Sequence, residues 1–558
     1  FDVTETTHYG LTHDGVDGNV TLISQNDVAR DKNVLYLFNV GAASFVRNWA
    51  AGSIHVTTDS DEINLEDTNY SLREALIYAA IGVLSTQATY VDTSTITFAE
   101  GIQTITMSDA YDEFVVTDGI AGIAAQTGEP FKITAGEGRT ITVKVARTYA
   151  EDPQNASTYR VLRIGNYLNT QHDWNITLEN LTLEGGKVTE TDQGGHGGVI
   201  YAKGHDINLT LSGVSASNAY AAGSGGGIYS AASGANTILI DNGSAINNNT
   251  VGGSGGGIYS IATQSTITLD NQSTIDNNTA ANDGGGIYSI ALTSSTITVD
   301  NASSISGNKA TAGSGGAIYN YAKDNASVEI LGDSQHEANL YTTISNNIAN
   351  THGGAIYNVS MVNANVLIGT RYNNADKKID VRTTLSTNKA TTGSGGAIYN
   401  VARNVGADGL GVNLQNVEVE AIVTIQNADI LNNEAATSGG GIYNLAEAYN
   451  RAKIDTAYGA DPNYTTSHTT ANVFVEQYSM ISGNKATDGA GIYNDSYSQS
   501  YNQGRQYYQD GSYSLLNYSK ATADSTVSVW DSTLANNEAT GKGGAIYNTP
   551  RTGSASIK

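Results

Sequence analysis

Three aspartates recur at one position of a repeating sequence and are the first residues to consider for chemistry. Asp241, Asp270 and Asp300 are spaced about 30 residues apart, so a repeating fold brings their carboxylates into line. Carboxylates in such arrays serve as general acids and bases in polysaccharide-cleaving enzymes. Each aspartate is followed directly by asparagine, however, and both residue types favour tight turns. We therefore interpret the three as turn residues, and no other carboxylate pair stands out.

Two lysines at one repeat position would suit the basic residue of a polysaccharide lyase. Lys389 and Lys485 each follow an asparagine that recurs down the chain, and Glu434 and Glu538 take the same place in the alternate repeats. Opposite charges that alternate along a stack attract, whereas like charges repel. The alternation favours a surface charge ladder over a catalytic role.

The glycine-rich turns were considered as metal sites. The run from Gly252 to Gly257 resembles the calcium-binding Gly-Gly-x-Gly-x-Asp repeat but lacks its aspartate. Asp283 and Asp488 each occur in one such turn only, so calcium is a possible ligand that the motif does not support. His196 and His352 stand 156 residues apart without metal-ligand spacing. We interpret them as polar turn residues and predict no metal and no cofactor.

The elements that position these residues share the signature Gly-Gly-x-Ile-Tyr, or a close variant of it. The tyrosines recur at intervals of 28 to 54 residues. Repetition at such periods predicts a solenoid of stacked units. The column comprises Tyr201, Tyr229, Tyr259, Tyr288, Tyr319, Tyr357, Tyr399, Tyr443, Tyr493 and Tyr547.

A second column consists of asparagines, each preceded three positions earlier by Ile or Leu. Its members are Asn249, Asn278, Asn308, Asn347, Asn388, Asn433, Asn484 and Asn537. Stacked parallel strands bring equivalent side chains into register. We predict an aliphatic core stack, a ladder of asparagine amides at a turn, and tyrosines at a bend. Asn to Tyr is always 9 to 11 residues, whereas Tyr to Asn grows from 20 to 44, so we expect a fixed scaffold with insertions enlarging at one corner.

Composition narrows the class of protein. The 558 residues include no Cys, only 4 Pro and many Gly, and the net charge is −26. The charge argues against nucleic acid or anionic lipid as partner. No run of about 18 apolar residues is present, so we expect no membrane insertion by this chain.

The segment before the repeats predicts a cap. Ser71 and Glu74 form a capping-box pattern at the start of a helix over 71–80, whose apolar stripe suits a plug on the first coil. Alternating strands are expected at 94–98, 104–107, 140–143 and 176–178. A free N-terminal strand containing Phe1 and Val3 is a candidate assembly segment, and 34–40 is a candidate buried strand.

The motifs resemble a family. Ser-Leu-Arg-Glu-Ala-Leu, then Thr-Ile-Thr-Phe-Ala-Glu-Gly, then Gly-Gly-Ala-Ile at 315–318, 353–356, 395–398 and 543–546 resemble bacterial surface proteins with polymorphic outer-membrane-protein type repeats. The resemblance covers about residues 60 to 548, with Ile or Leu in place of the family's Phe in Phe-x-x-Asn. It implies a right-handed parallel β-helix, export to the cell surface after signal-peptide removal, and a binding or structural role.

Four segments follow from these patterns. We predict an N-terminal strand and cap region over 1–60, a cap helix and first coils over 61–190, the repeat β-helix over 191–548, and a C-terminal tail over 549–558 at an open solenoid end. An open end exposes strand edges and favours head-to-tail self-association.

The last insertion is the candidate interaction surface. Tyrosine among Ser, Asn, Gln and Gly is typical of adaptable binding loops, and a carbohydrate or a cell-surface protein would suit it. The alternative is that these tyrosines pack on the flank of the solenoid. They are Tyr497, Tyr501, Tyr507, Tyr508, Tyr513 and Tyr518.

The function expected is therefore non-enzymatic: an extracellular adhesin or structural subunit, either a filament former or a passenger cut from its anchor. The alternative is a polysaccharide lyase or glycoside hydrolase on the same scaffold.

Overall fold

The computed structural model describes residues 8–13, 20–24, 54–63, 69–76, 95–111, 113–116, 130–165, 172–189, 195–332, 341–369, 382–405, 416–452, 465–502, 505–510, 512–515, 519–551 and 553–558. These fall into two compact units, 1–253 with 257–260, and 254–256 with 261–558. In each unit the chain winds in coils, and each full coil runs through a first leg, a second leg, a side strand and a short turn strand.

The first unit stacks these strands in parallel. First legs are β6 (Phe114–Val116), β9 (Leu162–Ile164), β13 (Ile200–Gly204) and β17 (Ile228–Ala232). Second legs are β3 (Ile54–Val56), β4 (Thr95–Phe98), β7 (Pro130–Thr134), β10 (Trp174–Glu179), β14 (Ile207–Ser212) and β18 (Ala235–Asp241). Side strands are β5 (Thr104–Thr106), β8 (Ile141–Lys144), β11 (Leu181–Glu184), β15 (Ser215–Ser217) and β19 (Ala245–Asn247). Turn strands are β12 (Lys187–Val188), β16 (Tyr220–Ala221) and β20 (Thr250–Val251). A separate antiparallel pair is β1 (His8–His13) with β2 (Val20–Ser24).

The second unit repeats the plan with longer strands. β21 (Ile258–Leu269), which begins in the first unit, and β24 (Ile287–Val299) each run through both legs. The other first legs are β27 (Ile318–Ala322), β31 (Ile356–Ser360), β35 (Ile398–Val405), β39 (Ile442–Ala452), β43 (Ile492–Asn502) and β49 (Ile546–Pro550). The other second legs are β28 (Asn325–Leu331), β32 (Asn363–Gly369), β36 (Asn416–Gln426), β40 (Thr465–Glu476), β46 (Ser519–Val529) and β50 (Gly553–Ile557).

The remaining strands of the second unit are short. Side strands are β22 (Thr274–Asp276), β25 (Ser304–Ser306), β29 (Thr343–Ser345), β33 (Thr383–Ser386), β37 (Ala428–Leu431), β41 (Met480–Ser482) and β47 (Thr533–Ala535). Turn strands are β23 (Thr279–Ala280), β26 (Lys309–Ala310), β30 (Ile348–Ala349), β34 (Lys389–Ala390), β38 (Glu434–Ala435), β42 (Lys485–Ala486) and β48 (Glu538–Ala539). β44 (Arg505–Tyr507) and β45 (Tyr513–Leu515) form an antiparallel hairpin.

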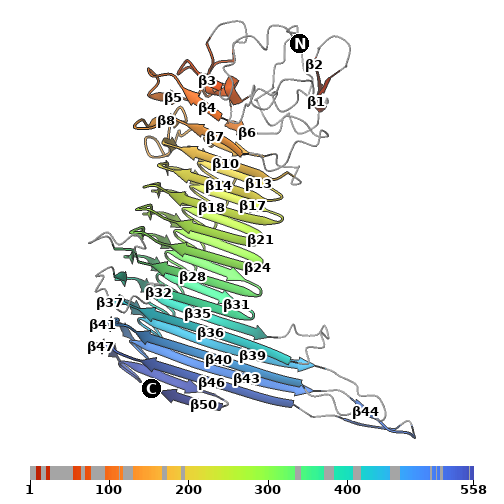
Figure 1. The fold of residues 1–558 in the computed structure, drawn as a ribbon, viewed down its shortest axis with the longest axis vertical. Helices are drawn as coiled ribbons and strands as arrows, with labels where there is room; N and C mark the ends of the chain where they lie inside the picture. Colours follow the sequence, from red (N-terminus) through yellow and green to blue (C-terminus); the bar gives the residue numbers. More distant parts are fainter. Residues whose placement is uncertain are drawn as a thin grey trace. The chain divides into compact units, whose positions relative to one another are not determined.

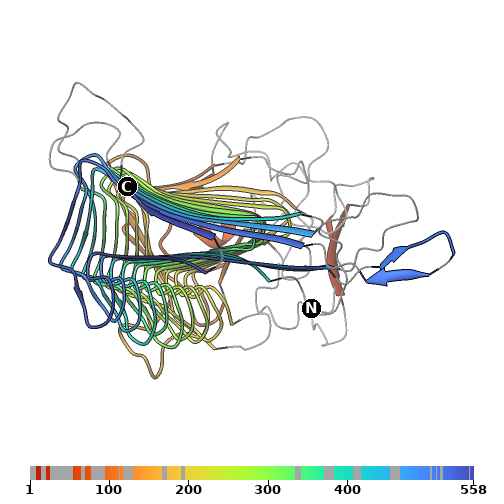
Figure 2. The same cartoon turned by 90° about the horizontal axis from the view of Figure 1, so that it is seen from below.

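Equivalent residues pair from coil to coil, as the repeat predicts. Ile318 pairs with Ile356, and Ile356 with Ile398, in parallel register. Figure 1 shows these first legs above one another within the second unit, and Figure 2, viewed from below, shows the two legs as separate layers. The Ile or Leu three positions before the ladder asparagine is fully buried in each coil from Ile246 to Ile481, and so are the signature isoleucines of all but the last coil. The predicted parallel β-helix and its aliphatic stack are therefore confirmed.

The asparagine column forms a buried amide ladder in the second unit. The Nδ2 of Asn347 donates to Oδ1 of Asn388 at 3.0 Å, and the Nδ2 of Asn388 donates to Oδ1 of Asn433 at 3.0 Å. The same Oδ1 atoms accept backbone N–H groups: Oδ1 of Asn388 accepts that of Asn347 at 3.0 Å. Asn278, Asn308, Asn484 and Asn537 continue this pattern. In the first unit Asn249 accepts from the Ala219 N–H and donates to the Ala216 carbonyl.

A second amide ladder was not foreseen from the sequence. It joins the two legs of the coils that carry it: Nδ2 of Asn444 donates to Oδ1 of Asn494 at 2.9 Å and also to the carbonyls of Ala421 and Asn472 on the second legs. The signal was present as an asparagine directly after the column tyrosine. The ladder comprises Asn320, Asn358, Asn400, Asn444, Asn494 and Asn548.

The column tyrosines stack as an aromatic ladder. Ring centroids lie 5.1 Å apart from Tyr201 through Tyr259 in the first unit and 4.7–5.2 Å apart from Tyr288 through Tyr547 in the second. Burial raises the pKa of Tyr229 to about 12, so the phenol stays protonated at any physiological pH. The sequence analysis expected the tyrosines at a bend, but they lie within the first-leg strands, and they face outward while the preceding isoleucines face inward.

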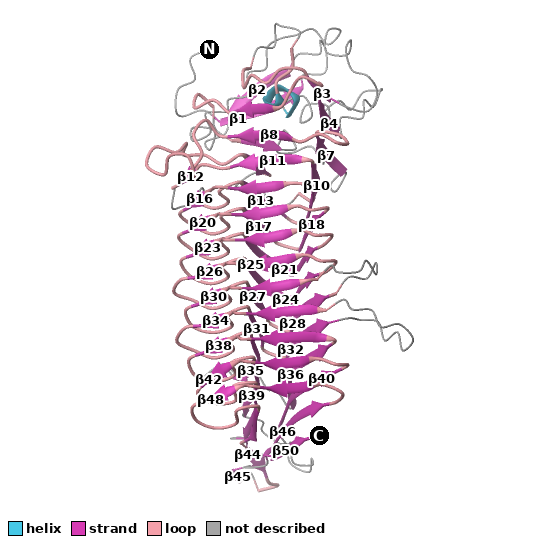
Figure 3. Cartoon of the chain, turned by 90° about the vertical axis from the view of Figure 1, so that its left-hand side faces the viewer, coloured by secondary structure: helices cyan, strands magenta, loops and turns pink. Residues whose placement is uncertain are grey.

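The predicted cap helix is present over 72–76 (cyan in Figure 3). Its capping box is formed in both directions: the Ser71 N–H donates to Oε2 of Glu74 at 2.8 Å, and the Glu74 N–H donates to the Ser71 hydroxyl at 3.2 Å. Leu72 and Leu76 are buried and share a small apolar cavity with core residues of the first coils such as Phe114. The helix therefore covers the core where the strands begin.

Two boundaries differ from the sequence prediction. β3 pairs in parallel with β4, so Ile54 already belongs to the stack, although it lies inside the segment expected to precede the solenoid. β50 pairs in parallel with β46, so residues expected to be a tail form a second-leg strand, with Ala555 and Ile557 in register with Ser525 and Val527. Predicted strands at 1–6 and 34–40 lie outside the described residues.

The growth of the coils occurs at two places rather than at one corner. Between β28 and β29, and between β32 and β33, residues are added after the second leg. From β35 onward the legs themselves lengthen, from 5 residues in β31 to 8 in β35 and 11 in β39 and β43. The spacing from the column tyrosine to the next ladder asparagine gives only the total length of this half-coil. It therefore cannot distinguish residues added after the second leg from residues added to the legs.

Replacement of Asn388 by alanine tests the first ladder. It leaves the Asn347 amides and the Ile344 carbonyl without their buried partner, and each such loss costs about 1–3 kcal/mol. We expect at least about 3 kcal/mol of lost unfolding free energy in urea titrations. The adjacent Lys389→Ala, which removes an exposed ion pair to Glu434, should cost less than about 1 kcal/mol. Equal effects of the two variants would contradict the ladder's role.

Candidate functional site

The lengthened legs of the second unit form a flank that projects beyond the shorter coils. We define this flank as β35, β36, β39, β40, β43 and β46 together with the β44–β45 hairpin, which extends furthest in Figure 1. β39 and β43 pair in register over their whole length, from Ile442 with Ile492 to Ala452 with Asn502. The extra residues thus continue the sheet and are not loose loops.

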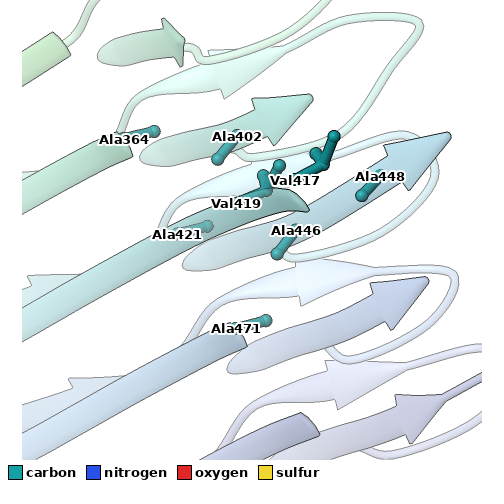
Figure 4. Packing of buried hydrophobic residues seen from close by; sticks show 8 residues of the cluster. All are labelled: Ala364, Ala402, Val417, Val419, Ala421, Ala446, Ala448 and Ala471. Carbon is teal, nitrogen blue, oxygen red and sulfur yellow. The ribbon is translucent and has the colours of Figure 1, made fainter. Parts of the chain in front are cut away.

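The interior of the flank is filled by small side chains. Buried alanines and valines from both legs pack together there, as Figure 4 shows. Because alanine has a short side chain, the two legs can approach closely and the flank is thin. Deeper in the scaffold the same inward positions carry isoleucine, such as Ile442 and Ile425. The cluster comprises Ala364, Ala402, Val417, Val419, Ala421, Ala446, Ala448 and Ala471.

The candidate tyrosines are distributed over the flank. Tyr497 and Tyr501 lie in β43, Tyr507 ends β44 and Tyr513 begins β45. Tyr508 and Tyr513 are 47% and 49% exposed, and the Tyr508 hydroxyl donates to Ser514 at 3.0 Å. Tyr518 lies outside the described residues. The sequence did not single out Tyr449 in β39, which is 42% exposed.

Tyr449 and Tyr497 form an aromatic pair on the outer face of the first legs. Their ring centroids are 5.9 Å apart, and the Arg551 guanidinium lies 5.7 Å above the Tyr497 ring. Arg551 is held by Asp495, whose Oδ2 accepts from Nη2 at 2.7 Å and from Nε at 3.0 Å. Rings and guanidinium together make a preorganised amphipathic surface.

Two carboxylates, Asp495 and Glu447, lie near this pair and are the candidates there for acid–base chemistry. Burial raises the pKa of Asp495, while Arg551 opposes that rise. Glu447 is paired with Arg403 on the neighbouring coil. Because each carboxylate is engaged by its own arginine, the arrangement favours fixed structure over proton transfer.

The charge ladder predicted on the turn strands has the expected partners. Lys389 pairs with Glu434 at 2.8 Å and Lys485 with Glu538 at 3.3 Å. All four side chains are well exposed, so each contact contributes little to stability.

The turn interpretation of the aspartates agrees with their contacts, since Oδ1 of Asp241, Asp270 and Asp300 each accepts the N–H of the following asparagine.

The residues that directly precede the left-handed glycines of the Gly-rich turns form a column from coil to coil. We call it the turn column. At four positions the residue of this column is His or Asp. Its side chain there accepts a hydrogen bond from the backbone N–H of the column residue in the following coil. The column comprises His196 and Ser224 in the first unit, and Ser254, Asp283, Ser314, His352, Ser394, Ser438, Asp488 and Lys542 in the second.

The turn column imposes a rule on the next coil. A β-carbon at Gly223, Gly313, Gly393 or Gly541 would overlap two groups one coil earlier: the acceptor atom of His196, Asp283, His352 or Asp488, and the backbone carbonyl of the residue before that acceptor. None of these four glycines has a positive φ, so space and not backbone conformation requires them. Where the earlier member is the smaller serine, threonine can follow: Ser314 contacts Thr351 and Ser394 contacts Thr437, both at 2.6 Å between hydroxyls.

The structure describes the two turn histidines but not the predicted assembly segment. Phe1 and Val3 lie outside the described residues, so their role stays a prediction.

His196 and His352 stack on Tyr229 and Tyr399, with centroids 4.5 and 4.6 Å apart. They are turn residues, as the sequence analysis inferred. Burial lowers the pKa of both imidazoles, which act as acceptors in the neutral form.

No helix among the described residues has the length and apolarity needed to span a bilayer.

Stacked parallel sheets with internal amide and tyrosine ladders define the molecule as a parallel β-helix. Residues 272–290, 302–321, 341–359 and 531–549 match the Chlamydia polymorphic membrane protein repeat. Each match holds one ladder asparagine, its glycine turn and its tyrosine, which is the constant half of the coil. The protein therefore carries polymorphic membrane protein repeats, as the motifs suggested. No curated protein and no solved structure matches the chain.

A double-variant cycle tests the turn-column rule. Gly313→Ala should destabilise the fold by about 1–3 kcal/mol, because the new methyl group overlaps Oδ1 of Asp283 and, less closely, the Asn282 carbonyl. Asp283→Ser removes the larger acceptor, so the double variant should be more stable than the sum of the single effects by at least about 0.5 kcal/mol. Urea unfolding of all four proteins measures the coupling, and strict additivity would contradict the rule.

The neutral state of His352 predicts a pH effect. Because the folded pKa lies below the unfolded value of about 6.5, this group stabilises the fold above that pH, and its contribution is lost as pH falls below it. Proton NMR should show its imidazole titrating below the range of an exposed histidine. His352→Gln keeps an acceptor for the Ser394 N–H and should reduce the loss of stability in acid. An unchanged acid profile would argue against this account.

Proposed function

We propose that this protein is a non-enzymatic adhesin displayed on a bacterial surface, whose flank contacts the ligand. The proposal rests on a difference in length variation between the two halves of each coil. The repeat-matched half keeps its length of 9 to 11 residues, whereas the legs opposite it lengthen to 11 or 12 residues and end in a hairpin. A scaffold of constant section that carries one variable, tyrosine-rich projection suits recognition at a distance from its attachment point.

The chemistry of the flank supports a polar ligand. Tyr449, Tyr508 and Tyr513 present rigid rings with hydroxyl groups, and Arg551 adds donors beside Tyr497. Such surfaces offer stacking and hydrogen bonding at low entropic cost. A cell-surface carbohydrate or a surface protein is the class of ligand we propose.

Surface location rests on the same family relation. The matched repeat is named for Chlamydia polymorphic membrane proteins, and we infer export and display by analogy with that name. Head-to-tail self-association is a further proposal of the sequence analysis, to be measured by light scattering and electron microscopy of the purified chain.

Variants of the flank test the adhesin proposal. We would label the chain fluorescently and measure its binding to cultured epithelial cells and to an immobilised glycan panel. Tyr449→Ser, Tyr508→Ser and Tyr513→Ser combined should lower binding at least tenfold, because these rings are exposed on the flank. The matched control combines Tyr341→Ser and Tyr478→Ser, whose rings are 42% and 69% exposed but lie outside the flank. It should bind like the parent chain.

Three outcomes would contradict the proposal: no binding by the parent chain, equal loss in the control, or shortening of the glycans. The last result would favour the alternative, a carbohydrate-active enzyme, and would direct attention to Glu447 and Asp495.

A further inference from the structure

Two consecutive coils of the first unit carry the same dipeptide at the bend between their legs. His205 and Asp206 join β13 to β14, and His172 and Asp173 precede β10 one coil earlier. Because Trp174 pairs with Ile207, the two His-Asp dipeptides occupy one register position. The two dipeptides lie 33 residues apart, so local metal-ligand spacing does not reveal them. In a solenoid, residues one coil apart are neighbours.

Three side chains of this bend converge. Ligand atoms of Asp173, His205 and Asp206 all lie within 4.8 Å of one another. Nδ1 of His205 is 2.9 Å from Oδ1 of Asp173 and 3.5 Å from Oδ1 of Asp206. Among the described residues, this is the one group of three or more such side chains close enough to share a metal ion.

Backbone groups hold both carboxylates in place. The Asp206 N–H donates to Oδ1 of Asp173 at 3.1 Å, and the Ala235 N–H of the following coil donates to Oδ1 of Asp206 at 2.7 Å. Gly234 leaves the room that this requires, since a β-carbon there would overlap Oδ1 of Asp206. Carboxylates oriented in this way by a second layer of donors are typical of metal ligands.

The charge arrangement calls for a cation. Asp173 and Asp206 stand in register on neighbouring coils, where like charges repel. The turn strands instead alternate Lys389, Glu434, Lys485 and Glu538 at equivalent positions. At the His-Asp bend, the basic side chain next to these two carboxylates is His205. The three side chains are between 33% and 49% exposed, so solvent can complete a coordination shell.

We propose that Asp173, His205 and Asp206 bind a divalent first-row transition metal ion, with Zn²⁺ as the representative ion. One imidazole nitrogen with two carboxylates suits Zn²⁺ and its neighbours better than Ca²⁺, which prefers six or more oxygen ligands. Binding displaces the proton that His205 shares with Asp173. The site ties two coils together at the bend and lies in a different unit from the flank, so it stands or falls independently of the adhesin proposal.

Metal titration of the full chain tests the site. Isothermal calorimetry with ZnCl₂ at pH 7.5 should show one site, and Co²⁺ should give a visible absorption band from its coordination by His205. Asp206→Asn keeps an oxygen acceptor for the Ala235 N–H, so it should fold normally yet bind Zn²⁺ at least tenfold more weakly. His205→Ala should remove the Co²⁺ band. The control His468→Ala changes a histidine in β40 whose Nδ1 contacts Thr522, and it should bind as the parent chain does.

Circular dichroism melting without metal confirms that each variant is folded. The proposal is overturned if the parent chain binds no Zn²⁺, if His205→Ala binds it equally well, or if Ca²⁺ binds as tightly as Zn²⁺. The last result would mean that a surface of net negative charge attracts any divalent cation.

Discussion

The structure depends on the satisfaction of buried amide groups between successive coils. A ladder asparagine such as Asn388 is fully buried, and its side chain bonds both neighbouring coils and the backbone. An unpaired amide in that position would cost more than the hydrogen bond itself contributes. Each coil is therefore in register with the next, and a shift by one residue would leave a column of buried polar groups without partners.

This constraint explains why one half of the coil is constant and the other is free to vary. The ladder, the glycine turn and the column tyrosine all lie in the half that the family repeat matches. The legs need only continue an existing pairing, so residues can be added at their ends without disturbing the columns. The second ladder, with Asn444 and Asn494, joins the legs near the scaffold, and beyond it alanines keep the layers close.

Much of the fold could be predicted from the sequence because stacking turns position along the chain into position in space. The columns of Ile, Asn and Tyr, the capping box at Ser71 and the charge alternation at Lys389 were all readable as spacings. The leg-joining ladder was not predicted, although an asparagine directly follows the tyrosine at Tyr319-Asn320 and its equivalents. The repeated signature had been defined as ending at the tyrosine. The prediction that all insertions lie at one corner was wrong. The spacing between a column tyrosine and the next ladder asparagine gives the total length of that half-coil and cannot locate an insertion within it.

Side-chain constellations were harder to predict for a related reason. Tyr449 and Tyr497 meet only because their strands pair in register, although they are 48 positions apart in the sequence. Asp173 and Asp206 are likewise one coil apart, and no local motif marks them. In a solenoid the informative distance is the length of the coil, and that length varies here from repeat to repeat. Sites can be found from sequence only after the register of each coil has been assigned, which makes the amide ladders a reference frame for function as well as a source of stability.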